Sequence, residues 1–191
     1  MKMELVEAIK TRRSIRQFKP DPVPEELIKE VIETALWAPS GMNTQPWKVI
    51  VVSGEKRNEF NATIQKAVNH INERLKRLFP EKMQKRIHGY FKDLGGAPHI
   101  IVVVVAKNDN IKQQETEIQA GSALMQNLCL VAHDKGLGTC WMSAPLWIED
   151  EVMDFLGMKN EWKLVAVTPL GYPDQNPPVP PRKGDPIIWI K

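Results

Sequence analysis

The chain has 191 residues and a net charge of +3; 42% of the residues are hydrophobic and 26% are charged. These proportions are typical of a soluble globular domain with a substantial core. No stretch approaches the roughly 20 apolar residues of a membrane span, and two cysteines are too few for a disulfide framework.

The sequence also predicts where the protein is located, which partners it lacks and how the chain is divided. The N-terminus leads directly into an amphipathic pattern, so we predict no signal peptide and a cytoplasmic location. The small positive excess does not require nucleic acid, and we expect neither a nucleic-acid nor a membrane partner. We predict one domain over residues 1–172, with an extended arm of the same domain over 173–191.

The first half of the chain alternates helical patterns with one strand. Apolar residues recur at helical spacing in three segments, 3–11, 24–36 and 55–79. Residues 48–53 are mostly β-branched and predict a strand. Residues 80–96 are basic and poorly periodic, and we interpret them as a helix fragment with loops that covers a site.

The second half contains the more apolar elements. The β-branched run at 99–107 predicts a buried central strand, and 115–135 predicts the most apolar helix. Residues 137–145 follow as a short strand that runs into a turn. A further helix over 149–156 and a last core strand over 162–170 complete the pattern.

The C-terminal arm is expected to be extended. Six of the 15 prolines lie between Pro173 and Pro186, and this density excludes a helix. The arm ends in Ile187-Ile188-Trp189-Ile190, which is too apolar to remain in water. We predict that it adds as a strand to a sheet edge, either of this chain or of a partner.

A basic stretch near the N-terminus is the first candidate for function. Between Lys10 and Lys19 there are five cations and no carboxylate, and Ser14 lies among the arginines. The planar fork of arginine matches phosphate and polar ring edges well, so the stretch suits an organic phosphate with a polar ring system. Taken alone, these residues favour the alternative, a solvated basic turn after a helix.

A second candidate is the loop Pro39–Trp47, which holds small and amide residues between two prolines. Such a segment is conformationally restricted and rich in hydrogen-bonding groups. An ordinary rigid connection would have the same composition, so the loop alone does not decide its function.

The sequence offers no side chains for metal or nucleophilic chemistry. No His or Cys pair has ligand spacing on one face, and Cys140 lies where a buried structural thiol is expected. The pair Gly95-Gly96 precedes a strand instead of following one, so it is not a dinucleotide fingerprint. An enzyme built from these residues takes its chemistry from a bound organic cofactor; the alternative is that the chain is not an enzyme.

Several motifs together resemble the FMN-dependent nitroreductase family. The N-terminal pair, Arg12–Phe18 and Pro39–Trp47, has a spacing specific to that family. The remaining matches follow in the family's order: Gln126-Asn127-Leu128, Gly136–Trp141, Gly171-Tyr172-Pro173 and Pro181-Arg182-Lys183. The resemblance implies an α+β fold with three layers, α/β/α, around a mixed and mainly antiparallel sheet. It also implies a homodimer whose C-terminal strand is exchanged between subunits.

The resemblance assigns FMN-binding roles to residues of this sequence. Arg12, Arg13 and Ser14 would hold the phosphate, the ribityl chain and the pyrimidine edge. Arg16 would lie near N1 and O2, where negative charge develops on reduction. Backbone amides of Met142 and Ser143 would face N5 and O4.

Two more segments would complete each site at the dimer interface. One loop of the partner subunit would cover the flavin, with contacts from Pro39, Ser40, Gly41 and Asn43. Arg182 would return from the arm to the phosphate, with Lys183 as the alternate.

The implied activity is that of an FMN-dependent oxidoreductase with a ping-pong mechanism. Flavin N5 would take hydride from NADH or NADPH and pass electrons to a small-molecule acceptor such as a nitroaromatic or a quinone, with no catalytic side chain. Family members often carry an acidic residue and a glycine where Met142 and Ser143 stand, and some branches dehalogenate or cleave rings, so the acceptor stays open.

Two alternatives to this enzyme come from other classes of protein. The absence of a catalytic side chain would also fit a flavin-binding or storage module without turnover. A basic RNA-binding domain would need exposed aromatic residues among the cations, and only Phe18 is near them.

Overall fold

The fold is organised around one antiparallel sheet. The computed structural model describes residues 3–184 and 186–190. Its four strands lie in the order β1-β2-β4-β3, where the bounds are β1 Trp47–Ser53, β2 His99–Ala106, β4 Trp162–Gly171 and β3 Gly138–Thr139. The named strands all pair antiparallel, and among the described residues a parallel pairing occurs only as an isolated bridge between Ser14 and Thr139. The predicted mainly antiparallel sheet is therefore confirmed.

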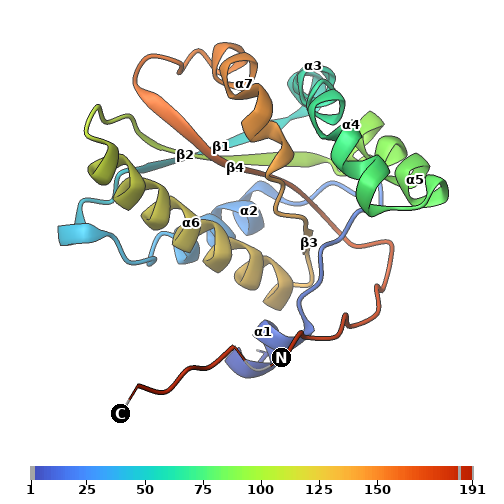
Figure 1. The fold of residues 1–191 in the computed structure, drawn as a ribbon, viewed down its shortest axis with the longest axis horizontal. Coiled ribbons are helices and arrows are strands. Elements are labelled where there is room, and N and C mark those ends of the chain that lie inside the picture. Colours follow the sequence, from blue (N-terminus) through green and yellow to red (C-terminus); the bar gives the residue numbers. More distant parts are fainter. Residues whose placement is uncertain (1–2, 185, 191) are drawn as a thin grey trace.

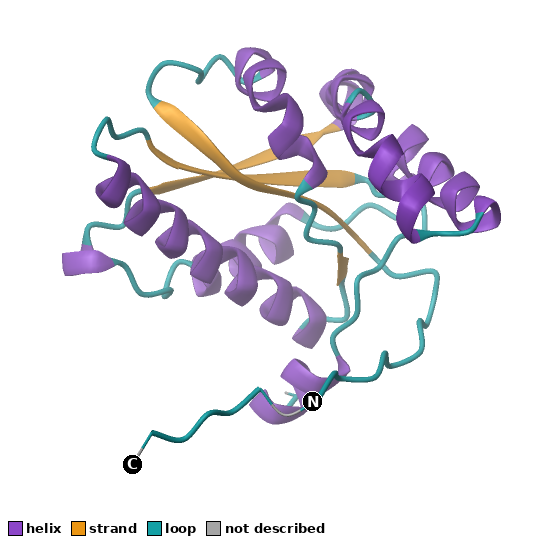
Figure 2. Ribbon diagram, viewed as in Figure 1, coloured by secondary structure: helices purple, strands orange, loops and turns teal. Residues whose placement is uncertain are grey.

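Helices cover both faces of the sheet and produce the predicted three layers (Figure 1 and Figure 2). One face carries α2 (Glu25–Ala35) and α6 (Ile111–Asp134), and α1 (Leu5–Thr11) lies near the C-terminal end of α6. The other face carries α3 (Gly54–Ile64), α4 (Ala67–Leu78), α5 (Glu81–Asp93) and α7 (Glu149–Phe155). Three short 3₁₀ turns connect these elements: η1 (Gly41–Asn43), η2 (Leu94–Gly96) and η3 (Ala144–Ile148).

The alternation of side chains along β2 divides the core into two halves. Ile101, Val103 and Val105 pack with α2 and α6, whereas Ile100 and Val102 pack with the four helices of the other face. Every residue from 99 to 105 is buried. The central position that the β-branched run predicts is confirmed, because only a strand covered on both faces can bury consecutive residues.

Two predictions for the segment 55–96 were wrong. The single helix over 55–79 is two helices, because α3 turns Phe60 and Ile64 toward the sheet while α4 packs against η3. Residues 80–96 contain the complete helix α5, which buries Phe91. α5 is rich in charged residues and buries mainly Phe91, so its apolar stripe is narrow and easily overlooked in the sequence.

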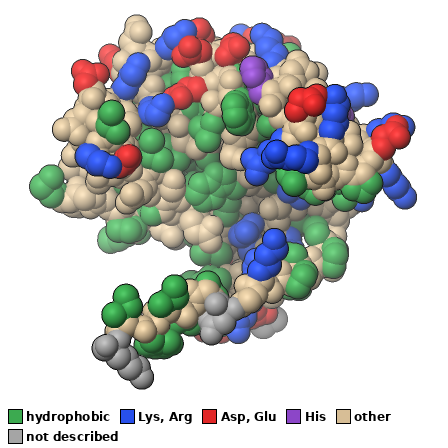
Figure 3. All heavy atoms as spheres, in the orientation of Figure 1, with side chains coloured by type: hydrophobic (Ala, Val, Ile, Leu, Met, Phe, Trp, Pro, Cys, Tyr) green, Lys and Arg blue, Asp and Glu red, His purple; other side chains and the backbone are tan. Residues whose placement is uncertain are grey.

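The C-terminal arm is extended, and residues 186–190 form no strand with this chain's own sheet. Ile188, Trp189 and Ile190 are 79% or more exposed, and Figure 3 shows the apolar side chains along the projecting arm. Addition to the chain's own sheet edge was therefore wrong, and addition to a partner's edge stays a prediction. Within the described residues, no helix is both long and apolar enough to cross a membrane.

Candidate functional site

The basic stretch is held in an extended conformation by three segments that are far apart in the sequence. On one side the Ile15 amide donates to the carbonyl of Thr139 in β3 (2.8 Å), and the Phe18 amide donates to the Gly95 carbonyl in η2 (2.9 Å). On the other side the start of the C-terminal arm runs antiparallel to it: Asp174 N donates to Gln17 O, and Lys19 N donates to Tyr172 O, both at 2.9 Å. We call residues 12–18 in this setting the cradle.

Three glycines allow the cradle to approach these segments. A Cβ on Gly95 would lie 2.1 Å from the Arg16 carbonyl oxygen, and one on Gly138 would lie 2.8 Å from Ile15 Cβ. A Cβ on Gly171 would lie 3.1 Å from the ring of Phe18. No side chain fits at such distances, so the glycines of the sequence motifs serve close packing of the cradle rather than direct phosphate contact.

Arg12 and Arg13 lie beside the C-terminal end of α6. The Thr11 hydroxyl and His133 Nε2 are 2.9 Å apart, and burial followed by the charges of Arg12 and Arg13 lowers the pKa of His133. Arg13 Nη1 donates to the carbonyls of Lys10 and Arg12 and thereby closes the end of α1. Its Nε is buried without a hydrogen-bond partner.

The segment after β3 brings Met142 and Ser143 to the same side of the molecule as the cradle. The Met142 amide donates to the Val167 carbonyl (2.9 Å), so this chain already uses it and it is not available to a ligand. This corrects the expected role of that amide. Ser143 precedes η3 and is exposed, and within the described part of the chain its amide has no acceptor.

Tyr90 of α5 is a neighbour of Met142 that the sequence did not indicate. Its hydroxyl lies 3.4 Å from Met142 Sδ. Burial raises the pKa of Tyr90 well above 10, the Cys140 thiol raises it further, and the charge of Arg16 opposes this shift. α5 therefore forms one wall of the region between Arg16 and Met142.

The loop with Pro39, Ser40, Gly41 and Asn43 lies at the opposite end of α6 (Figure 1). A Cβ on Gly41 would lie 3.2 Å from Thr116 Cγ2, whereas the cradle meets the same helix at His133. At 1.5 Å per residue these two points are about 25 Å apart along the helix. Within one chain the loop cannot contact the cradle.

The backbone of this loop is constrained and exposed. Met42, Asn43 and Gln45 all have positive φ, at 52°, 56° and 47°. The Gln45 amide donates to Ser40 Oγ at 3.0 Å and stabilises the turn. Non-glycine residues in this conformation cost about 1–3 kcal/mol each and tend to cluster at functional sites.

A sequence profile described as the nitroreductase family matches residues 9–172. The chain belongs to the nitroreductase family. It is 33% identical to the Bacillus subtilis (strain 168) protein YfhC, named as an NAD(P)H nitroreductase, over 93% of this chain and 89% of the relative. It is 30% identical to the nitroreductase NfnB of Mycolicibacterium smegmatis, over 87% of this chain and 81% of the relative.

A solved structure extends this likeness to three dimensions. A nitroreductase from Desulfitobacterium hafniense DCB-2 with bound FMN has a TM-score of 0.76 and 25% identity, and the match covers 100% of both chains. The family assignment and the nitroreductase-like α+β fold predicted from the motifs are therefore confirmed.

The residues at the cradle fit the cofactor of this family. The buried, unpartnered Nε of Arg13 requires an acceptor, and the surrounding arginines supply positive charge for a phosphate. Arg182 and Lys183 are exposed on the arm, so their expected phosphate contact stays a prediction. Among the described residues, no group of three or more His, Cys, Asp and Glu is placed to hold a metal ion.

Two surface depressions lie outside this region. One, of about 480 Å³, is lined by residues of α7, by the segment before β4, and by Lys48 of β1 and Trp162 of β4. The other, of about 450 Å³, follows the outer face of α5. Neither includes a cradle residue.

Proposed function

We propose that the chain binds FMN in the cradle, takes hydride from NADH or NADPH, and passes electrons to a small organic acceptor such as a nitroaromatic or a quinone. An FMN-dependent NAD(P)H oxidoreductase is the class of enzyme to which the family assigns it. The observation that carries the proposal is the arginine-rich cradle itself, whose buried Arg13 Nε lacks a partner.

The proposal gives roles to four residues of the cradle, Arg12, Arg13, Ser14 and Arg16. The bound flavin supplies the reversible acceptance of a hydride. Arg12 and Arg13 neutralise the phosphate, and Ser14, whose carbonyl accepts from Gln175 Nε2 at 3.4 Å, lies beside them in the backbone. Arg16 is the exposed cation that faces the region of Tyr90 and Met142. A fixed positive charge there stabilises the negative charge that reduction places on the ring.

Ser143 is the backbone donor of the site. Its amide, unlike that of Met142, has no acceptor within the described part of the chain. It lies between β3 and η3, directly after the bridge that Met142 makes to Val167 of β4. A preorganised amide with no internal acceptor stabilises a developing negative charge without reorganisation. We therefore assign to the Ser143 amide the contact with flavin N5 and O4 that the resemblance implies for the amides of Met142 and Ser143 together.

A homodimer completes the site, with the loop 39–43 of each subunit over the cradle of the other. The separation of loop and cradle along α6 supports this arrangement. So do exposed apolar side chains on the loop and on α1: Trp37, Met42, Leu5, Val6 and Ile9 are 51–92% exposed. Removal of apolar surface from water stabilises by about 25 cal/mol per Å², so burial of these side chains between two subunits would stabilise a dimer.

The decisive experiment is anaerobic mixing of the purified, FMN-loaded protein with NADH and with NADPH. Rapid loss of the oxidised flavin absorbance is expected with at least one of them. A two-substrate rate matrix should then give parallel lines in double-reciprocal form, as alternation of donor and acceptor requires. A flavin that stays oxidised with both donors would instead support a storage module without turnover.

A further inference from the structure

Arg57 of α3 makes an unusual set of contacts for a half-buried arginine. Its Nε donates to the Ala97 carbonyl at 2.9 Å, and its Nη2 donates to the Asp93 carbonyl. Its remaining contact, from Nη1 to Asn58 Oδ1, is 3.1 Å. Burial lowers the pKa of Arg57, and the charge of Asp93 only partly opposes this shift. The chain thus places a guanidinium in a costly environment to hold two backbone carbonyls.

Those two carbonyls begin and end a turn whose backbone is left-handed. Between Asp93 and Ala97, Leu94, Gly95 and Gly96 all have positive φ, at 52°, 68° and 76°. The Asp93 carboxylate accepts from the Gly95 amide at 2.9 Å. Arg57 therefore holds both ends of a turn in which Leu94 adopts a conformation that non-glycine residues disfavour.

The same turn supports the backbone of the cradle. The Gly95 carbonyl accepts from the Phe18 amide, and the Gly95 α-carbon lies directly against the Arg16 carbonyl, where even a methyl group would not fit. A displacement of the turn would therefore displace Arg16. These contacts connect Arg57, through residues 93–97, to the backbone of Arg16 in the cradle.

We propose that Arg57 is a positioning residue that sets the place of Arg16 through the turn 93–97. It touches neither the flavin nor the substrate in this role. The proposal rests on the proposed function, because the effect of Arg16 on a bound flavin is part of that function.

The test compares Arg57→Met, Arg57→Lys, Arg16→Met and the double variant Arg16→Met/Arg57→Met. Lys56→Met is the matched control, since Lys56 is exposed on the same helix and its ion pair among the described residues is with Glu59. For each FMN-loaded protein, the midpoint potential and the dissociation constants of oxidised and reduced FMN are measured. Circular dichroism confirms the fold.

Arg57→Met should shift the potential in the negative direction, as Arg16→Met does. We expect a loss of about tenfold in the preference for reduced over oxidised FMN, which equals about 30 mV for a two-electron couple. Arg57→Lys should restore only part of it, because an amine cannot bridge both carbonyls. Lys56→Met should leave the potential unchanged.

The double variant separates positioning from a direct effect of charge. If Arg57 acts through Arg16, the double variant should shift no further than Arg16→Met alone. Additive shifts, or an unchanged potential in Arg57→Met beside a shifted one in Arg16→Met, would overturn the positioning role alone. An unchanged potential in Arg16→Met would overturn the role of Arg16 in the proposed function, and the role of Arg57 with it. Should Arg57→Met fail to fold, Arg57→Lys carries the same comparison.

Discussion

The contact between the η2 turn and the cradle can be tested by replacing Gly95 with alanine. A Cβ at this position would lie 2.1 Å from the Arg16 carbonyl oxygen and 2.6 Å from its carbonyl carbon, and both are backbone atoms that cannot rotate away. The left-handed conformation, φ = 68°, costs an alanine about 1–2 kcal/mol more than a glycine. Separation of the two segments would also weaken the hydrogen bond from Phe18, at a further cost of about 1 kcal/mol.

The total, about 3 kcal/mol, corresponds to a decrease in Tm of about 6–12 °C for a domain of this size. Two glycines provide controls: Gly54 has φ = 59° with nothing near its absent Cβ, and Gly89 lies in α5 with nothing near it either. Gly54→Ala should show the conformational cost alone, and Gly89→Ala should stabilise by up to about 1 kcal/mol. Denaturant unfolding of the three variants measures these differences. A Gly95→Ala variant no less stable than Gly54→Ala would refute the close packing of turn and cradle.

Three other predictions concern two arginines of the cradle and the neighbouring His133 of α6. Arg12→Ala should weaken FMN binding by about 1.5–3 kcal/mol through loss of a charge-assisted contact, measurable by fluorescence titration; unchanged retention would contradict its phosphate role. Arg16→Ala should lower the flavin reduction potential more than the FMN affinity, and an equal potential in spectroelectrochemical titration would exclude a charge near N1 and O2. The pKa of His133 is lowered from 6.5 in the fold, so the unfolded chain protonates first as pH falls, and the apo-protein should lose stability below about pH 6.5. His133→Gln should remove that part of the pH dependence in unfolding experiments between pH 5 and 8, and an identical profile would show that another group causes it.

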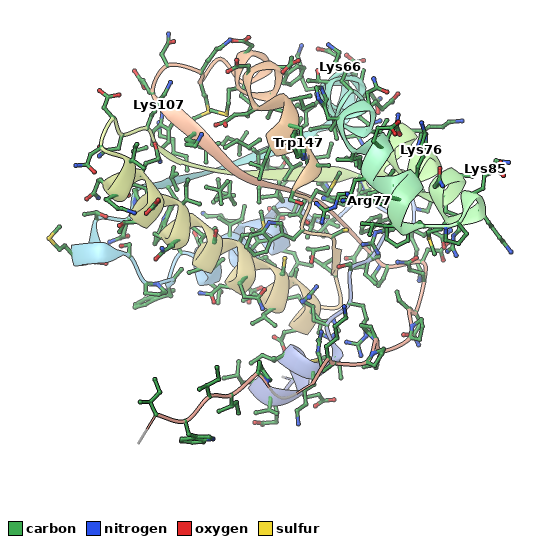
Figure 4. The ribbon with its side chains drawn as sticks, viewed as in Figure 1. Lys66, Lys76, Arg77, Lys85, Lys107 and Trp147 are labelled. Atoms are coloured by element: carbon green, nitrogen blue, oxygen red, sulfur yellow. The ribbon has the colours of Figure 1, made fainter. Side chains whose placement is uncertain are left out.

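The positive charge of the α4–α5 segment predicts a difference between NADPH and NADH as hydride donors. Between residues 66 and 93 there are eight Lys or Arg residues and three Asp or Glu residues, and Figure 4 shows Lys76 and Lys85 projecting from this segment. Such a field attracts the extra phosphate of NADPH more than NADH, so kcat/KM for NADPH should fall more steeply with salt. Equal salt dependence for the two donors would mean that this surface does not steer them.

Much of the fold could be predicted because its signals are local. The run from Ile100 to Ala106 is fully apolar and forms most of the central strand, and the apolar stripe of residues 24–36 forms α2. The helix α5 was missed because it buries little besides Phe91 and exposes charge on the remaining sides. The division between α3 and α4 at Gln65 depends on the place of η3, which follows more than 75 residues later.

The site could be predicted only as a set of motifs. The motifs named Arg12, Arg13 and Arg16 correctly as neighbours in one segment, but the partners of that segment come from β3, η2 and the C-terminal arm. The pair Gly95-Gly96 could be seen in the sequence, but its contact with the backbone of Arg16 could not be predicted. Close packing of two distant backbone segments leaves no periodic pattern in the sequence. The use of the Met142 amide by Val167 likewise depends on a pairing between strands rather than on either residue.

Strained backbone is found at two places beside the proposed site. Among the described residues, the non-glycine residues with positive φ are Met42, Asn43 and Gln45 in the loop and Leu94 in the turn. The first three lie in the segment assigned to cover the flavin, and Leu94 lies in the turn that supports Arg16. Because such conformations cost free energy, they persist only where surrounding contacts over-determine them. The fold thus tolerates an unfavourable backbone conformation at two places beside the proposed site. Because the backbone of Arg16 is held in this way, its charge would stabilise negative charge on a bound flavin ring without reorganisation.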